Sequence, residues 1–264
     1  MRYLIKLAYD GTEFIGWQKQ KQGRSIQVIM EKALTNFTER ETPIVGAGRT
    51  DAGVHALGQY AHFDYEGRMQ PDQMLKAFSR WLPEDIKVIE ITEVGSELSA
   101  RYQAYERCYK YILTKDRTPF NRNRSGFIPH LRIELEPMLN AAPAFLGKHD
   151  FSTFGRLNPE VTNHVCEIKE LSITENDEDF IFIVRADRFL HNMVRRIVGT
   201  LANVSHFALG PDTITRLLEE RCSRQRLVLT APACGLYLID VKYPIELLDG
   251  RITYKFDDLI KRKR

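Results

Sequence analysis

The residues with the clearest chemical potential lie in one glycine-rich stretch, which reads Gly46-Ala47-Gly48-Arg49-Thr50-Asp51-Ala52-Gly53. Three glycines in eight residues, between two strand-like segments, predict a tight loop with close backbone approach. The loop would display Asp51 two positions from Arg49. A carboxylate displayed in this way can act as a nucleophile or as a base near neutral pH.

A phosphate-binding loop is the main alternative for this stretch. The dinucleotide pattern G-x-G-x-x-G requires a third glycine where Asp51 stands, and no Gly-Lys-Ser/Thr follows as in a P-loop. An anionic side chain in the loop would also repel a phosphate. A lone Arg-x-Asp is more often a turn cap or a structural ion pair, so only the whole pattern supports a catalytic Asp51.

The cysteines and histidines predict no metal site. The cysteines form no C-x-x-C pair and lie at no zinc-ligand spacing from a histidine; they are Cys108, Cys166, Cys222 and Cys234. His55 and His62 lie on an extended segment at a separation that suits no common metal motif. We expect four reduced thiols, and we interpret both histidines as structural or RNA-facing.

The net charge is only +3, but the basic residues gather in local patches. These patches are Lys19, Lys21 and Arg24; Lys115, Arg117, Arg122 and Arg124; Arg221, Arg224 and Arg226; and the segment 261–264. Basic patches on a nearly neutral chain suit a groove for a polyanion. Charge alone favours the alternative of solvated faces and a basic tail.

Periodicity predicts the elements that would position these residues. Alternation of apolar and polar residues predicts strands at 2–9, 54–65, 85–94, 107–114, 165–174, 180–187 and 235–243. Helical spacing predicts a helix capped by Ser25, a short helix opened by Pro71, and helices at 137–146, 189–206 and 211–221. Two α+β halves, 1–104 and 105–264, are the simplest arrangement, each a sheet backed by helices.

The class of protein follows from length and composition. A chain of 264 residues that is 43% hydrophobic can bury a sizeable core. No apolar run reaches the ~20 residues that a membrane span needs, and the N-terminus lacks the apolar region of a signal peptide. We therefore expect a cytoplasmic enzyme or binding protein with no membrane association.

Residues Gly48–Ala56 resemble the signature of the tRNA pseudouridine synthase A family. Weaker matches follow in family order: Tyr9-Asp10-Gly11-Thr12, Gly16-Trp17-Gln18, Arg24-Ser25-Ile26-Gln27, Leu82-Pro83, Ala100-Arg101, Arg107 with Tyr109-Lys110-Tyr111, Gly147-Lys148-His149-Asp150-Phe151, Met193-Val194-Arg195 with Ile197-Val198-Gly199, and Gly235-Leu236-Tyr237-Leu238. They span residues 9–238, so chance is a poor explanation. The chain departs from the family pattern at Ser79, usually Asn, and near Asn163, usually Arg.

The resemblance implies the chemistry and the fold. The family isomerises uridine to pseudouridine in the anticodon stem-loop of tRNA, at nucleotides 38–40, without a cofactor and as a homodimer. It implies RRM-like or ferredoxin-like layers in the two halves, flanking a central active-site cleft. Asp51 would be the catalytic carboxylate; attack on the sugar, addition to the base and removal of a sugar proton all stay open for it.

The resemblance also assigns roles around Asp51. Tyr109 would stack on the flipped uracil. Arg195 would keep Asp51 charged, although periodicity alone does not choose between Arg195 and Arg196, of which one should face solvent. Leu236 would pack behind the base, and Arg49 would fill the space that the base leaves or hold a phosphate. The basic residues expected to bind RNA are Lys19, Lys21, Arg24, Arg122 and Arg124.

Two other function classes fit parts of the sequence. An RNA-binding module without catalysis would lack a use for the loop carboxylate, and the aromatic-rich RNP consensus is absent. A glycosidase or nucleotide hydrolase that used Asp51 would usually need a second carboxylate as acid, and no partner motif is present. Formation of pseudouridine in tRNA separates the three.

Overall fold

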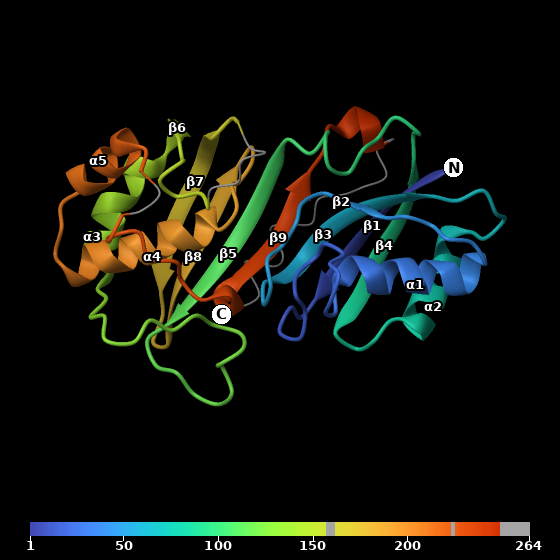
Figure 1. The fold of residues 1–264 in the computed structure, drawn as a ribbon, viewed down its shortest axis with the longest axis horizontal. Coiled ribbons are helices and arrows are strands. Elements are labelled where there is room, and N and C mark those ends of the chain that lie inside the picture. The colour runs from blue at the N-terminus through green and yellow to red at the C-terminus, as the bar shows by residue number, and fades with distance from the viewer. Residues whose placement is uncertain (157–161, 223–224, 249–264) are drawn as a thin grey trace. The chain divides into compact units, whose positions relative to one another are not determined.

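The computed structural model describes residues 1–156, 162–222 and 225–248 (Figure 1). The chain packs into two compact units built from interleaved segments. The first unit holds Met1–Ala52, Ala56–Tyr105 and the described residues from Ile239 onward, and the second holds Gly53–His55 and Glu106–Leu238. The two units are defined by contacts within the fold. The division into domains 1–104 and 105–264 stays a prediction.

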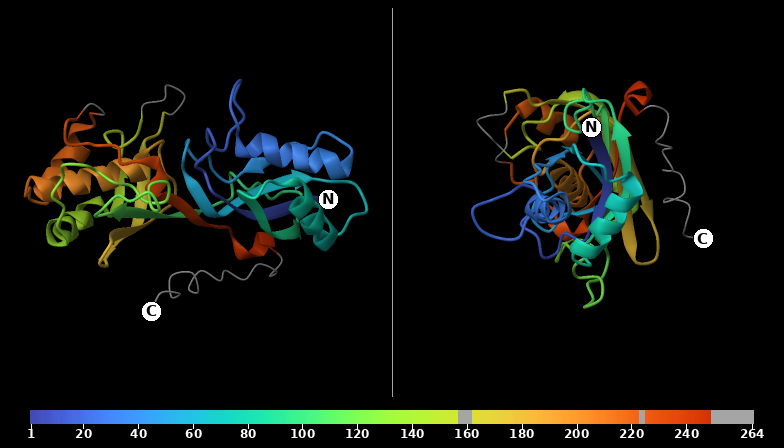
Figure 2. Two further views of the ribbon diagram at one scale, coloured as in Figure 1. Left: turned by 90° about the horizontal axis from the view of Figure 1, so that it is seen from below. Right: turned by 90° about the vertical axis from the view of Figure 1, so that its right-hand side faces the viewer.

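The first unit is an antiparallel sheet with two helices packed side by side on it (Figure 2). Its elements are β1 Arg2–Tyr9, α1 Ile26–Thr38, β2 Val45–Gly46, β3 His55–Asp64, α2 Pro71–Trp81, β4 Ile86–Val94 and η3 Ile245–Leu248. The strands follow the order β4-β1-β3, with β2 paired to β3. The predicted alternation of strands and helices is confirmed for β1, α1, β3, α2 and β4, and β2 is an additional strand.

Helices α1 and α2 begin for different physical reasons. At α2, Pro71 occupies the first turn, and the side chains of Gln70 and Gln73 cap each other's backbone. The predicted cap by Ser25 on α1 is wrong. Ser25 is the N-terminal flanking residue, but its hydroxyl makes no capping bond and is buried. Burial of the apolar face that contains Met30 and Leu34 therefore holds α1.

The second unit is also a sheet covered by helices. Its elements are β5 Glu106–Thr114, α3 Leu135–Ala141, η1 Ala142–Phe145, β6 Gly147–Asp150, β7 Val165–Glu175, β8 Asp179–Ala186, α4 Met193–His206, α5 Asp212–Glu220 and η2 Ala233–Gly235. The strand order is β5-β8-β7-β6, all antiparallel. Strand β9, Leu236–Lys242, contributes Leu236–Leu238 to this unit and Ile239–Lys242 to the first.

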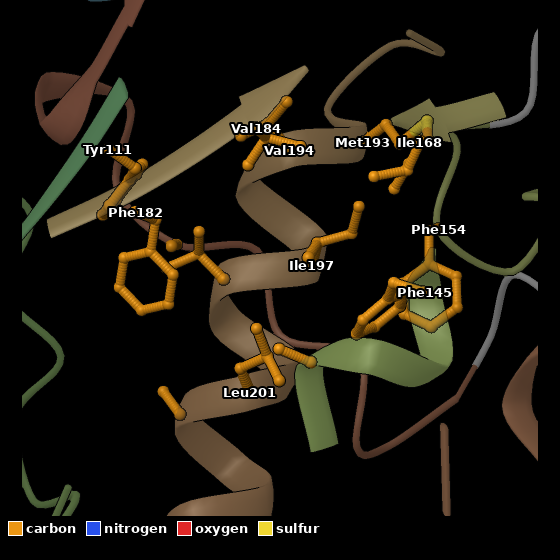
Figure 3. Packing of buried hydrophobic residues seen from close by; sticks show 14 of the residues in the cluster. Tyr111, Phe145, Phe154, Ile168, Phe182, Val184, Met193, Val194, Ile197 and Leu201 are labelled. Carbon is orange, nitrogen blue, oxygen red and sulfur yellow. The ribbon is translucent and has the colours of Figure 1, made fainter. Parts of the chain in front are cut away.

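The core of the second unit forms around α4. Figure 3 shows Val194, Ile197 and Leu201 of this helix in one buried cluster. The same cluster contains Phe182 of β8 and the rings of Phe145 and Phe154. The predicted spacing of apolar residues therefore marks the buried face of α4. Sheets backed by helices confirm the α+β class.

Two predicted helices begin or end differently. The helix predicted at 189–206 begins at Met193, because Asn192 adopts a left-handed φ of 64° that a helix cannot contain. The helix predicted at 137–146 continues past Ala141 only as the 3₁₀ turn η1, where Pro143 lacks the amide hydrogen that α-helix needs. The short strands β2 and β6 were not predicted, since so few residues show no periodicity.

Among the described residues, none of the helices has the length and hydrophobicity that a membrane span requires.

Candidate active site

Asp51 lies on the turn between β2 and β3, and the segment before α1 braces this turn from one side. The amide of Trp17 donates to the carbonyl oxygen of Thr50 at 3.0 Å. Gly16 pairs with Asp51 as an antiparallel bridge. The backbone at the carboxylate is thereby held in an extended, sheet-like conformation.

A buried hydroxyl pair fixes the residue next to the carboxylate. The hydroxyls of Tyr9 and Thr50 lie 2.8 Å apart and are buried. Burial raises the pKa of Tyr9 well above its ordinary value, so its phenol is neutral near neutral pH. On the other side, the side-chain amide of Gln59 donates to the carbonyl oxygen of Gly48 at 3.0 Å. The loop is therefore anchored at both ends of the Gly48–Thr50 segment.

Two glycines permit the close approach that the sequence predicts. Gly16 has a φ of +104°, and a β-carbon there would lie 2.5 Å from the carbonyl oxygen of Thr50. A β-carbon on Gly46 would lie 2.5 Å from the ring of Trp17. Gly48 has open space around it. The tight packing is thus on the side of Trp17, away from Gly48.

Burial alternates along the turn. Thr50 is buried, Asp51 is half-buried and Arg49 is exposed. The two charged groups that the sequence singles out are therefore both accessible to solvent, while the hydroxyl between them is not. This arrangement can present a carboxylate to a ligand without moving the backbone.

In the second unit, β5 holds Tyr109 half-buried beside Phe189. The two rings meet edge to face, with centroids 5.1 Å apart. Tyr111, two residues along the strand, is fully buried, and its hydroxyl donates to the carbonyl oxygen of Pro232 at 2.8 Å. Tyr111 is therefore a core residue. Leu236 is buried in the same hydrophobic cluster, and Tyr109 packs against that cluster.

Arg195 lies in the first turn of α4 and is held by two acceptors. Its Nε–H donates to the carbonyl oxygen of Ala231 at 2.7 Å, and its Nη1 donates to Oδ1 of Asn192 at 2.9 Å. Asn192 flanks the start of α4 with a left-handed backbone, and its side chain is there within reach of Arg195. The guanidinium is thereby fixed in orientation.

The expectation that Arg195 or Arg196 faces solvent is wrong. Both are half-buried. Arg196 donates from Nη1 to the carbonyl oxygens of Gly155 at 2.6 Å and Thr153 at 3.2 Å. Burial lowers the pKa of Arg196. Helical periodicity could not reveal these acceptors, because they come from a loop about 40 residues away in the sequence.

The predicted RNA-binding residues differ in their surroundings. The guanidinium of Arg24 pairs with both carboxylate oxygens of Asp85, at 2.5 and 3.1 Å, and lies 4.4 Å from the ring centroid of Phe14. Lys19, Lys21, Arg122 and Arg124 are exposed. Arg224 and the segment 261–264 lie outside the described residues.

Within the described ranges, no group of three or more His, Cys, Asp or Glu side chains could hold a metal ion. None of the four cysteines is in a disulfide. Burial raises the pKa of Cys166 to about 12, so this thiol stays protonated and unreactive.

Sequence reasoning missed two residues that hold candidate site residues, Tyr9 beside Thr50 in the first unit and Asn192 beside Arg195 in the second. Tyr9 was part of a strand pattern, and Asn192 was assigned to the interior of a helix. The available signal for Asn192 was its residue type, since asparagine favours both left-handed backbone and positions that flank helices.

Comparison with known proteins gives a consistent family assignment. A family model described as tRNA pseudouridine synthase matches residues 6–103 and 141–244. The tRNA pseudouridine synthase A of Bacteroides fragilis is 41% identical over 250 residues, covering 94% of this chain and 98% of that protein. The tRNA pseudouridine synthase A of Acetivibrio thermocellus is 39% identical over 239 residues, covering 90% and 97%. This chain therefore belongs to the tRNA pseudouridine synthase family, whose enzymes are isomerases.

Proposed function

We propose that this protein isomerises uridine to pseudouridine in the anticodon stem-loop of tRNA, at nucleotides 38–40, with Asp51 as the catalytic carboxylate. The observation that carries the proposal is the Gly48–Ala56 signature on a loop whose Thr50 is hydrogen-bonded by Trp17 and Tyr9. The relatives named tRNA pseudouridine synthase A support tRNA as the substrate.

The reaction breaks the bond between N1 of uracil and C1′ of the ribose, turns the base and joins C1′ to C5. The base loses a hydrogen from C5 and gains one at N1, so atoms and electrons balance without an oxidant or a second substrate. A carboxylate can supply the nucleophile or the base that this exchange needs. We propose that the enzyme works without a metal or nucleotide cofactor.

The remaining site residues have proposed roles toward the flipped base. Tyr109 stacks on the uracil, and its edge-to-face contact with Phe189 supports a fixed ring. Leu236 packs behind the base. Arg195 keeps Asp51 charged by opposing the desolvation that a closed pocket would impose. Arg49 fills the vacated space or holds a phosphate. The proposed setting is a cleft flanked by RRM-like or ferredoxin-like layers.

The proposed RNA contacts are the exposed residues Lys19, Lys21, Arg122 and Arg124. Arg24 is exposed as well but pairs with Asp85, so we propose a weaker RNA contact for it. We also propose that the protein acts in the cytoplasm as a homodimer.

Release of tritium from C5-labelled uridine in tRNA tests the function, after extensive EDTA treatment and gel filtration of the protein. We expect full activity for the wild type and a loss of at least about 100-fold for Asp51→Asn, because the reaction loses its carboxylate. The matched control is Asp72→Asn at an exposed position in the first turn of α2, which should keep the wild-type rate.

Three results would contradict parts of this proposal. A wild-type protein that releases no tritium from tRNA removes the function. An Asp51→Asn variant that keeps a tenth or more of the wild-type rate removes Asp51 as the carboxylate. Activity that disappears with EDTA and returns only with zinc removes the cofactor-free mechanism.

A further inference from the structure

One aromatic ring stands almost entirely in solvent on the loop that follows β5. Phe120 is 93% exposed, more than any other large hydrophobic side chain among the described residues. Figure 1 shows this loop, drawn in green, extending away from the end of β5. A phenyl ring gains nothing from such a position in the folded chain alone.

The loop that carries Phe120 is built by its neighbour Asn121. Oδ1 of Asn121 accepts from the amide of Thr118 at 2.8 Å, and its Nδ2 donates to the carbonyl oxygen of Asp116 at 2.9 Å. The carbonyl oxygen of Asn121 accepts from the amides of Arg124 and Ser125 at 2.9 and 3.0 Å. These bonds order the turn before any ligand arrives, so binding there loses little conformational entropy.

The base of the loop is tied to the second unit's sheet. The amide of Thr114 donates to the carbonyl oxygen of Gly126, and the amide of Gly126 donates to Ile112, both at 2.8 Å. The hydroxyl of Tyr237, on β9, donates to the carbonyl oxygen of Arg124 at 2.6 Å. Phe120 is therefore presented from a fixed support.

The segment that contains Phe120 is rich in basic residues. The segment 115–124 carries Lys115, Arg117, Arg122 and Arg124 but only one acid, Asp116. All four are exposed, and Lys115 is paired with Glu175 at 2.8 Å. A flat apolar surface flanked by guanidinium groups complements a base with phosphates on either side. A single ring among polar residues is too small for an apolar protein interface core.

We infer that Phe120 stacks on an unpaired nucleobase of tRNA while Arg122 and Arg124 contact the phosphates next to it. This inference rests on the proposed function, which supplies tRNA as the ligand, and adds a second stacking position on a different part of the second unit's chain from Tyr109. The loop then contributes both charge and ring stacking to the hold on the RNA.

The test is binding of an unmodified tRNA transcript, measured by fluorescence anisotropy at several salt concentrations. Phe120→Ala should weaken binding about five- to a hundredfold, with the log–log salt slope unchanged, because the ring contacts no phosphate. Phe120→Trp should keep the wild-type affinity, because an indole ring can also stack on a base. It should also add a tryptophan emission that tRNA quenches. The matched control is Phe207→Ala, which removes another exposed phenylalanine of the same unit and should bind like the wild type.

Two outcomes would overturn the inference. In one, Phe120→Ala binds tRNA within twofold of the wild type. In the other, light scattering shows that Phe120→Ala changes the oligomeric state, which would place the ring against a second copy of the chain. Tritium release by the wild type is measured separately, so failure of the enzymatic proposal and failure of the stacking position give different results.

Discussion

At the scale of single residues, the orientation of Arg195 depends on an asparagine that makes an unusual backbone turn. Asn192 has a φ of 64° and accepts a hydrogen bond from Nη1 of Arg195 at 2.9 Å. Its conformation starts α4, and its side chain holds the guanidinium. We therefore regard Asn192 as a positioning residue for Arg195.

Replacing Asn192 with glycine separates these two roles, since glycine keeps the left-handed backbone but removes the acceptor. We expect Asn192→Gly to lower kcat for pseudouridine formation about tenfold while KM for tRNA changes little, given that a hydrogen bond to a charged group contributes roughly 1.5–3 kcal/mol. Steady-state kinetics and the thermal midpoint check this.

A wild-type kcat in Asn192→Gly would show that Ala231 alone orients Arg195. The paired variant Asn192→Asp keeps an acceptor and should retain more activity than the glycine variant. If the variant lost activity because its thermal midpoint had fallen, Asn192 would be a residue that stabilises the fold and not a positioning residue.

At the scale of elements, close packing of α4 depends on a glycine inside the helix. A β-carbon on Gly199 would overlap the carbonyl oxygen of Leu229, in the segment whose Ala231 bonds to Arg195. Glycine costs an ordinary helix up to about 1 kcal/mol relative to alanine, so its presence here has a packing reason.

We therefore expect Gly199→Ala to destabilise the protein by about 1–3 kcal/mol, against the helix propensity of alanine, because the segment at Leu229 must move. Urea unfolding measures the effect. The control is Ser79→Ala on the exposed face of α2, which should change the free energy of unfolding by less than about 0.5 kcal/mol. A Gly199→Ala variant as stable as the wild type would mean that the segment yields without cost.

His62 on β3 is buried, and the folded protein favours its neutral form. Nδ1 of His62 accepts from the amide of Ala100 at 3.1 Å. Burial, and then the charge of Arg2, lower the pKa of His62 below its ordinary 6.5, while Asp64 opposes them. An acceptor nitrogen cannot be protonated without losing its bond.

The sign of the pH dependence follows. Below about pH 6.5 the unfolded chain binds a proton at this position more readily than the folded chain, so stability falls as the pH drops from there toward the folded pKa. His62→Asn keeps an acceptor oxygen but cannot titrate. We expect its thermal midpoint to fall less between pH 7.5 and 5.5 than that of the wild type; equal falls in the two proteins would contradict the assignment.

At the scale of the whole molecule, the net charge of +3 hides local differences in what basic residues do. Arg24 is bound to Asp85, whereas Arg122 and Arg124 stand in solvent. Arg24 is also exposed, but a cation that is paired with a carboxylate gains less from a phosphate, so affinity for tRNA should depend more on the second group.

Replacing Arg122 and Arg124 with glutamine should weaken tRNA binding and reduce its log–log salt slope by up to about 0.9 per lost contact, with turnover at saturating tRNA changed much less. Affinity across a salt series and single-turnover rates test this. The control pair is Arg40→Gln with Arg216→Gln, one exposed arginine after the end of α1 and one on α5. An unchanged slope would identify the loop arginines as ordinary solvated surface.

Local periodicity and short motifs were enough to predict the longer strands, most helices and the family. Alternation over eight or more residues marks a strand whatever it pairs with, and β1 was predicted to the residue at Arg2–Tyr9. The glycine-rich stretch around Asp51 could likewise be read as a displayed carboxylate. Alternation could not distinguish the half-buried Tyr109 from the fully buried Tyr111, since both lie on one face of β5.

Which polar side chains form hydrogen bonds and ion pairs became clear from the folded chain. The ion pair of Arg24 joins residues 61 positions apart, and the hydroxyl pair of Tyr9 and Thr50 joins residues 41 apart. Hydrophobic patterns describe which face of an element is buried, but hydrogen bonds and ion pairs depend on angles and distances that arise when distant segments meet. For this reason the sequence could indicate Asp51, while the residues that hold its loop and orient Arg195 became visible only in the folded chain.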